Sequence, residues 1–170
     1  KKGDELFEIV HEAAKEFNGA VIAPNTIRTI EGGLLSYQSD FGREHNPFTI
    51  GLDRLVDLDQ DIDFIGKEAL KKIKSEGISE KLVGVEIDGD PIQKVPENFW
   101  PVFDENHKKI GRLSRCFFSP RLKKNIGLAI IDINFVEPGT PLVIESPKAH
   151  LNAQVHELPW FPAEKSTHLD

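Results

Sequence analysis

The spacing of apolar residues changes near residue 80, and this change does most to limit what the chain can fold into. Before it, apolar side chains recur at helical spacing in residues 4–17 and again in residues 66–74. After it, apolar and polar side chains alternate, for example over residues 83–87. A period of two suits a strand, whereas a period of 3.6 suits a helix. The sequence therefore predicts an α+β chain in which helices come first and strands follow.

The second half of the chain contains six short strand candidates separated by turn residues. Prolines and glycines mark several of the turns, as in Ser119-Pro120 and Glu137-Pro138-Gly139. Short strands at this spacing predict a small antiparallel barrel or sandwich, and we place a domain boundary at residues 76–80. The predicted domains are residues 1–79 and residues 80–170. The six strand candidates are residues 83–87, 100–103, 109–118, 125–132, 141–146 and 150–156.

Composition excludes several classes of protein. Charged residues make up 29% of the chain and hydrophobic residues 39%, as in globular proteins. The formal net charge of −7 argues against a nucleic-acid-binding protein, and no apolar run approaches the ~20 residues of a membrane span. The single cysteine, Cys116, cannot form an internal disulfide, so we expect a reducing, cytoplasmic location and a thiol that packs rather than reacts. The chain contains no methionine, which predicts that it is a piece of a longer polypeptide.

Two charged patterns each allow a functional and a purely structural interpretation. Four aspartates alternate with other residues over residues 57–63, but the glycine and the closing glutamate of a calcium-binding loop are missing. We therefore predict a solvated face and no metal site. A basic stretch within residues 108–124 is either a solvated surface or a face that contacts an anion. Its members are Lys108, Lys109, Arg112, Arg115, Arg121, Lys123 and Lys124.

The segment from Thr26 to Tyr37 places one acid, Glu31, in an apolar run and follows it with two glycines. Asn25 can cap a short helix that ends near Glu31. A carboxylate among apolar residues is costly to bury unless hydrogen bonds satisfy it, and paired glycines allow a sharp turn or the close approach of another body. One hypothesis is a carboxylate at the wall of a ligand pocket. The alternative is a surface glutamate on a short amphipathic helix that ends at a glycine cap.

Eight segments, taken in order, resemble the C-terminal half of the glycine cleavage T-protein family of folate-dependent one-carbon transferases. No single segment is specific for this family, but the order and spacing of the eight segments together are specific for it. The resemblance runs from about residue 20 to about residue 160. The segments are Ile27-Arg-Thr-Ile-Glu-Gly-Gly-Leu-Leu35, Asn46-Pro-Phe48, Asp63-Phe-Ile-Gly-Lys-Glu-Ala-Leu70, Ile110-Gly-Arg-Leu-Ser114, Ser119-Pro120, Asn125-Ile-Gly-Leu-Ala129, Gly139-Thr140 and Ala153-Gln-Val-His-Glu-Leu-Pro159.

The resemblance implies that residues 1–79 are the end of a folate-binding domain and that residues 80–170 are a C-terminal β-barrel domain. It implies tetrahydrofolate as the cofactor and a small-molecule methyl donor. The family's pterin-binding glutamate corresponds to Glu31, whose carboxylate can accept two neighbouring pterin N–H donors. Tyr37 is expected to contact the same cofactor, with plain packing as the alternative. The family's catalytic aspartate lies in an N-terminal remainder of the polypeptide, so we assign no catalytic residue and expect the isolated chain to be inactive.

Within the family, residues 46–51 and 64–70 look most like the branch that demethylates dimethylsulfoniopropionate. Aminomethyltransferases carry two arginines at positions that here read Gln60-Asp61-Ile62 and Pro91-Ile92-Gln93. The resemblance therefore implies transfer of a methyl group from a sulfonium donor to N5 of tetrahydrofolate, in which the protein mainly aligns the two reactants. The rivals are a glycine cleavage aminomethyltransferase, a non-catalytic folate-binding protein whose cysteine motif this chain lacks, and a domain of a flavin-linked demethylating dehydrogenase.

Overall fold

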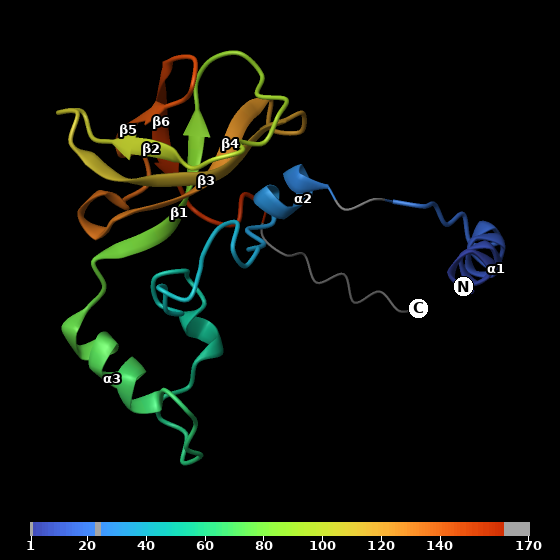
Figure 1. Ribbon diagram of the computed structural model, residues 1–170, viewed down its shortest axis with the longest axis horizontal. Coiled ribbons are helices and arrows are strands. Elements are labelled where there is room, and N and C mark those ends of the chain that lie inside the picture. The colour runs from blue at the N-terminus through green and yellow to red at the C-terminus, as the bar shows by residue number, and fades with distance from the viewer. Residues whose placement is uncertain (1, 23–24, 162–170) are drawn as a thin grey trace.

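The computed structural model describes residues 2–22 and 25–161, and in that part the helices precede the strands (Figure 1). The α-helices are α1 (Gly3–Lys15), α2 (Thr26–Glu31) and α3 (Lys67–Glu76), and the 3-10 turns are Asp53–Leu55 and Ile133–Phe135. The strands are β1 (Glu80–Ile87), β2 (Trp100–Phe103), β3 (Lys109–Ser119), β4 (Lys124–Asp132), β5 (Pro141–Glu145) and β6 (His150–His156). The predicted order of helices and strands is confirmed.

The six strands form a closed antiparallel barrel in the order β1-β4-β3-β2-β5-β6, and β6 pairs back with β1. The longest pairings join β4 to its two neighbours, β1 and β3. Closure leaves no sheet edge open to pair with another chain. The predicted small antiparallel barrel is confirmed, and the sandwich alternative is excluded. All six predicted strands are present, with the largest shift at β1, which begins three residues earlier than predicted.

Alternate residues of the strands fill the barrel interior. Ala129 and Ile131 of β4 belong to this core, whereas Ile126 and Leu128 belong to a second cluster. Because side chains alternate along a strand, β4 is therefore buried on both of its faces. The interior core consists of Val83, Val85, Ile87, Val102, Ile110, Leu113, Cys116, Ala129, Ile131, Leu142, Ile144, Ala153 and Val155.

The second apolar cluster lies on the outside of the barrel, against β4. There Ile126 and Leu128 pack with Ile30 of α2 and with Trp160, which follows β6. The indole of Trp160 lies close to the sheet because residue 84 is a glycine, where an added Cβ would come within 2.8 Å of the ring. The outer face of β4 thus attaches both α2 and the segment after β6 to the barrel, as the position of α2 in Figure 1 illustrates.

The three helices differ in how much they pack. None of the residues of α1 is buried, and Figure 1 shows this helix standing apart from the barrel. The helix predicted over residues 66–74 is confirmed as α3, although its first residue, Lys67, does not lie on a solvated face as the helical spacing of the apolar residues predicts for a lysine. Lys67 is buried and donates hydrogen bonds to the carbonyls of Gln60 and Ile62. The preceding loop folds over the start of the helix, where its carbonyl groups need donors.

Residues on either side of the proposed boundary at 76–80 are in contact. The backbone N–H of Leu82 in β1 donates to the carbonyl of Thr49, at 2.7 Å. The division into domains 1–79 and 80–170 stays a prediction, and residues 1, 23–24 and 162–170 of those ranges lie outside the described part. Within the described part, no helix combines the length and the apolar character that crossing a membrane requires.

Candidate functional site

Helix α2 places Glu31 at its last position, directly before a turn made by two glycines. Asn25 caps the start of the helix, because its Oδ1 accepts the N–H of Ile27 at 2.9 Å. At the other end, Gly32 has φ −83° and donates its N–H to the carbonyl of Arg28. Gly33 has φ +64°, the left-handed conformation that favours glycine. The short amphipathic helix with a glycine cap is therefore present, and the turn fixes where the side chain of Glu31 begins.

The side chain of Glu31 is half-buried and is held by the end of β3. Its Oε1 accepts a hydrogen bond of 2.6 Å from the hydroxyl of Ser119, which is fully buried. The same hydroxyl oxygen accepts the N–H of Leu122 at 3.1 Å, so the serine proton points toward the carboxylate. The N–H of Trp160 donates to the backbone carbonyl of Glu31 at 3.1 Å. Backbone and side chain of Glu31 are thus both bonded to the barrel side of the molecule.

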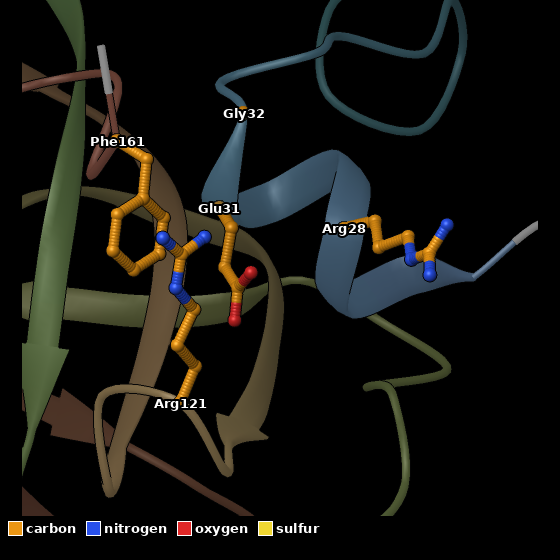
Figure 2. A pocket seen from close by; sticks show the side chains of 5 residues that line it. All are labelled: Arg28, Glu31, Gly32, Arg121 and Phe161. Atoms are coloured by element: carbon orange, nitrogen blue, oxygen red, sulfur yellow. The ribbon is translucent and has the colours of Figure 1, made fainter. Parts of the chain in front are cut away.

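Glu31 lines an open pocket of about 490 Å³ together with Arg28, Gly32, Arg121 and Phe161. The guanidinium of Arg121 lies over the ring of Phe161, 3.5 Å from its centroid, in a cation–π contact. Figure 2 shows the Arg121 side chain rising between that ring and the side chain of Glu31, whereas Arg28 points away. The pocket wall therefore combines a carboxylate, a stacked guanidinium and an aromatic ring. Such a wall suits a planar ligand that offers N–H donors and carries negative charge elsewhere.

The structure does not bring Tyr37 into this pocket. Its side chain is 53% exposed, and its ring makes an edge contact with Phe41 at 5.7 Å between centroids. The residues that line the pocket of Glu31 do not include it. The role predicted for Tyr37 in cofactor binding stays a prediction, and its present neighbour is an aromatic residue four positions along the chain.

The basic stretch of residues 108–124 does not present a single surface. Arg115 is buried against Asp40, whereas Lys124 pairs with Glu86 on the outside of the barrel at 2.6 Å. Arg121 is the member of the stretch that reaches the pocket of Glu31. The interpretation of the whole stretch as one face that contacts an anion is therefore too broad.

The barrel sequence matches a known family. Residues 80–162 match the model described as the glycine cleavage T-protein C-terminal barrel domain. The barrel is similar to that domain over these residues. The solved structure of glycine cleavage system aminomethyltransferase T from Bartonella henselae superposes with a TM-score of 0.69 over 78% of this chain and 36% of that one. Because the two chains are 20% identical, this likeness supports the fold alone.

Two curated relatives to which this chain is similar bear the name aminomethyltransferase. The one from Geobacillus sp. (strain WCH70) is 37% identical over 164 residues, which make up 94% of this chain and 43% of that protein. The one from Caldanaerobacter subterraneus subsp. tengcongensis is 38% identical over 142 residues, 82% of this chain and 36% of that protein. The chain thus spans less than half the length of these relatives. The demethylase branch finds no support in them and stays a prediction.

Ser119 and Phe161, which lie beside Glu31, were not predicted as site residues, and Arg121 was predicted only as one member of the basic stretch. Ser119 and Arg121 flank Pro120 at the turn after β3, and Phe161 follows the last strand. The sequence contained one usable signal, because Ser119-Pro120 is among the family-like segments and Arg121 comes directly after it. Nothing in the spacing connects Phe161 to Glu31, since 130 positions separate them.

Two further predictions concern Cys116 and metal binding. Burial raises the pKa of the Cys116 thiol to about 12, and its side chain packs in the interior core of the barrel, as predicted. Asp57, Asp59, Asp61 and Asp63 are all exposed. Among residues 2–22 and 25–161, no cluster of three or more histidine, cysteine or acidic side chains is placed to bind a metal ion.

Proposed function

We propose that this chain is the C-terminal part of a tetrahydrofolate-dependent one-carbon transferase of the aminomethyltransferase type. The observation that carries the proposal is the carboxylate of Glu31, anchored by Ser119 at the wall of an open pocket. The similarity to proteins named aminomethyltransferase supports the same class of reaction. The folate would supply N5 as the nitrogen that receives the one-carbon group.

The residues of this chain would bind and orient that folate. Within the described part, the hydrogen bond from Ser119 goes to Oε1 of Glu31, and no protein donor bonds to Oε2. A carboxylate offers about four lone-pair positions, so Glu31 can accept two adjacent N–H groups of a pterin ring while it keeps its bond to Ser119. The fixed bond to Ser119 limits rotation of the carboxylate, which favours one orientation of the ligand. Holding N5 in one place beside the donor is a proximity effect.

Arg121 would bind the same ligand as a hydrogen-bond donor. Its guanidinium lies over the ring of Phe161, 3.5 Å from the centroid, and its N–H groups remain able to donate to an acceptor on the ligand. The pterin ring carries a carbonyl oxygen next to the N–H groups that Glu31 would accept, and Arg121 lies beside Glu31 in the same pocket. We therefore assign the N–H edge of the pterin to Glu31 and its carbonyl oxygen to Arg121 within this proposal.

The sulfonium demethylase is the second candidate, and the family-like residues 46–51 and 64–70 are the observation that favours it. The relatives named aminomethyltransferase favour the first candidate. The two differ in the donor, which would be a lipoyl-bound aminomethyl group in one case and a small sulfonium compound in the other. Assaying the full-length protein with each donor separates them, because one reaction releases ammonia from a lipoylated carrier and the other releases a thioether.

The role of Glu31 is tested by tetrahydrofolate titration of the full-length protein and its Glu31→Gln variant. A charged hydrogen-bond pair is worth roughly 1.5–3 kcal/mol, so the substitution should weaken binding by about 10- to 100-fold. Glu105→Gln is the matched control, because Glu105 is an exposed acid in the turn between β2 and β3. Unchanged affinity in Glu31→Gln would show that the carboxylate does not bind the pterin. No binding by the unsubstituted protein would remove the folate proposal altogether.

A further inference from the structure

A buried ion pair joins the segment that carries Glu31 to the barrel. Asp40 is 0% exposed and lies in the loop after α2, whereas Arg115 is 9% exposed and lies in β3. The Nε of Arg115 donates to Oδ1 of Asp40 at 2.8 Å, and its Nη2 donates to Oδ2 at 2.6 Å. This two-pronged geometry is the strongest arrangement that an arginine and a carboxylate can form.

The carboxylate of Asp40 also accepts two further hydrogen bonds, one from the barrel and one from its own loop. The hydroxyl of Ser114, the neighbour of Arg115 in β3, donates to Oδ1 at 2.7 Å. The backbone N–H of Ser36 donates to Oδ2 at 2.7 Å. A buried carboxylate with four donors has little freedom to move, so Asp40 fixes the position of the guanidinium beside it.

Arg115 donates its other hydrogen bonds to one residue before Glu31 and one residue after Glu31 in the sequence. Its Nη1 donates to the hydroxyl of Thr29 in α2 at 2.9 Å. Its Nη2 donates to the carbonyl of Leu34, just after the glycine turn, also at 2.9 Å. One side chain of the barrel therefore touches the chain two residues before Glu31 and three residues after it.

A buried ion pair contributes little net stability, because the loss of hydration offsets most of the attraction. The apolar cluster of Ile30, Ile126, Leu128 and Trp160 already attaches α2 to the barrel. Apolar packing is not directional, however, and does not by itself fix the rotation of a six-residue helix. Five hydrogen bonds from Ser114 and Arg115 of the barrel to Thr29, Leu34 and Asp40 supply the direction that the packing lacks.

We propose that Arg115, held by Asp40, is a positioning residue that sets the place of Glu31 relative to Ser119 and Arg121. It acts through Thr29 and Leu34 and does not touch the ligand. The geometric part of the proposal is independent of the ligand, and only its effect on folate affinity rests on the function proposed above.

The test is hydrogen exchange in the full-length protein carrying Arg115→Lys. Lysine keeps the charge but cannot make the fork or reach Thr29 and Leu34 at once. The N–H groups of Gly33 and Leu34, which bond to the carbonyls of Ile30 and Thr29, should exchange about tenfold faster. Barrel amides in β1 and β4 should change by less than about twofold. Arg54→Lys is the matched control, because Arg54 is exposed and lies in a 3-10 turn away from α2.

A milder variant keeps the test decisive if Arg115→Lys does not fold. Thr29→Val keeps the shape of the side chain and removes one partner of Arg115, so the same amides should exchange faster by a smaller factor. Tetrahydrofolate affinity should fall by about tenfold in Arg115→Lys, while the Glu31 carboxylate itself is unchanged.

Two results would overturn the positioning role. One is unchanged exchange at Gly33 and Leu34 in both variants, and the other is a rise of equal size throughout the barrel, which would make the pair a general stabilising contact. If the unsubstituted protein binds no tetrahydrofolate but the exchange pattern is as expected, the positioning role stands and the proposed function falls.

Discussion

The barrel buries its apolar side chains, whereas helix α1 leaves its apolar side chains exposed. The barrel buries residues on the inside and, along β4, on the outside as well. Helix α1 buries none, and Leu6 is 62% and Phe17 83% exposed. A closed sheet provides its own partner for every strand, whereas a single helix needs another element to cover its apolar face. Most of the folding energy of the described part therefore lies in the barrel.

Helix α2 is the exception, and it shows where the two regions meet. Ile30 is fully buried, because the outer face of β4 and Trp160 supply the partner that α1 lacks. The candidate site lies at this contact, with Glu31 from the helical region and Ser119 and Arg121 from the barrel. The geometry of a site that two regions of unequal stability form together depends on how the less stable region is attached to the other.

The largest expected difference between the two regions is in the free energy of unfolding that is lost when a leucine is replaced by alanine. Leu113→Ala empties a fully buried position of the barrel and should lower the free energy of unfolding by about 2–5 kcal/mol. Leu6→Ala, on the exposed face of α1, should change it by less than about 0.5 kcal/mol. Urea unfolding of both variants provides the comparison. Equal losses would contradict it, because they would mean that α1 is packed as tightly as the barrel.

A smaller difference is expected between two glycines. An added Cβ at Gly84 would lie 2.8 Å from the indole of Trp160 and 3.0 Å from the carbonyl of His156, so Gly84→Ala should cost about 1–3 kcal/mol. At Gly3, the first residue of α1, an added Cβ would meet nothing within 4 Å. Gly3→Ala should therefore not destabilise the chain. Thermal unfolding measures both, and a stable Gly84→Ala variant would show that Trp160 is not packed on β1.

The smallest effect concerns Cys116 and appears in alkaline solution. Burial raises the pKa of this thiol to about 12 from a usual value of 9.0, so the folded state keeps the proton longer than the unfolded state. The thiol's contribution to stability is complete below about pH 9 and is lost as the pH rises toward 12. The Cys116→Ala variant should show a shallower decline in stability over this range. Identical slopes for the two proteins would contradict a buried, protonated thiol.

Much of the fold could be predicted because it rests on local pattern. Alternation over residues 83–87 and 150–156 and the turn residues between the other candidates identified all six strands, and helical spacing identified α1 and α3. Asn25 and the glycines after Glu31 also gave the short helix α2, since capping is a local interaction. Lys67 shows the limit of this approach, because its burial depends on a loop that folds back over the helix.

The partners of the site could not be predicted in the same way. Glu31 and Ser119 are 88 positions apart, and Asp40 and Arg115 are 75 positions apart. No period or spacing relates residues at such distances, and the basic stretch gave no sign that Arg115 turns inward while Arg121 turns to the pocket. The family resemblance singled out Glu31, but it did not indicate what holds that side chain.

The sequence by itself determined the order of helices and strands and the short helix that ends at Glu31, because strand alternation, capping and local turns act over a few residues. Only the tertiary structure decided that Ser119 would hold the carboxylate, that Phe161 would support Arg121, and that Asp40 and Arg115 would join the two regions. Those contacts form when the closed barrel brings the turn after β3 against the end of α2, and hydrogen bonds and ion pairs depend on such distances within a few tenths of an ångström.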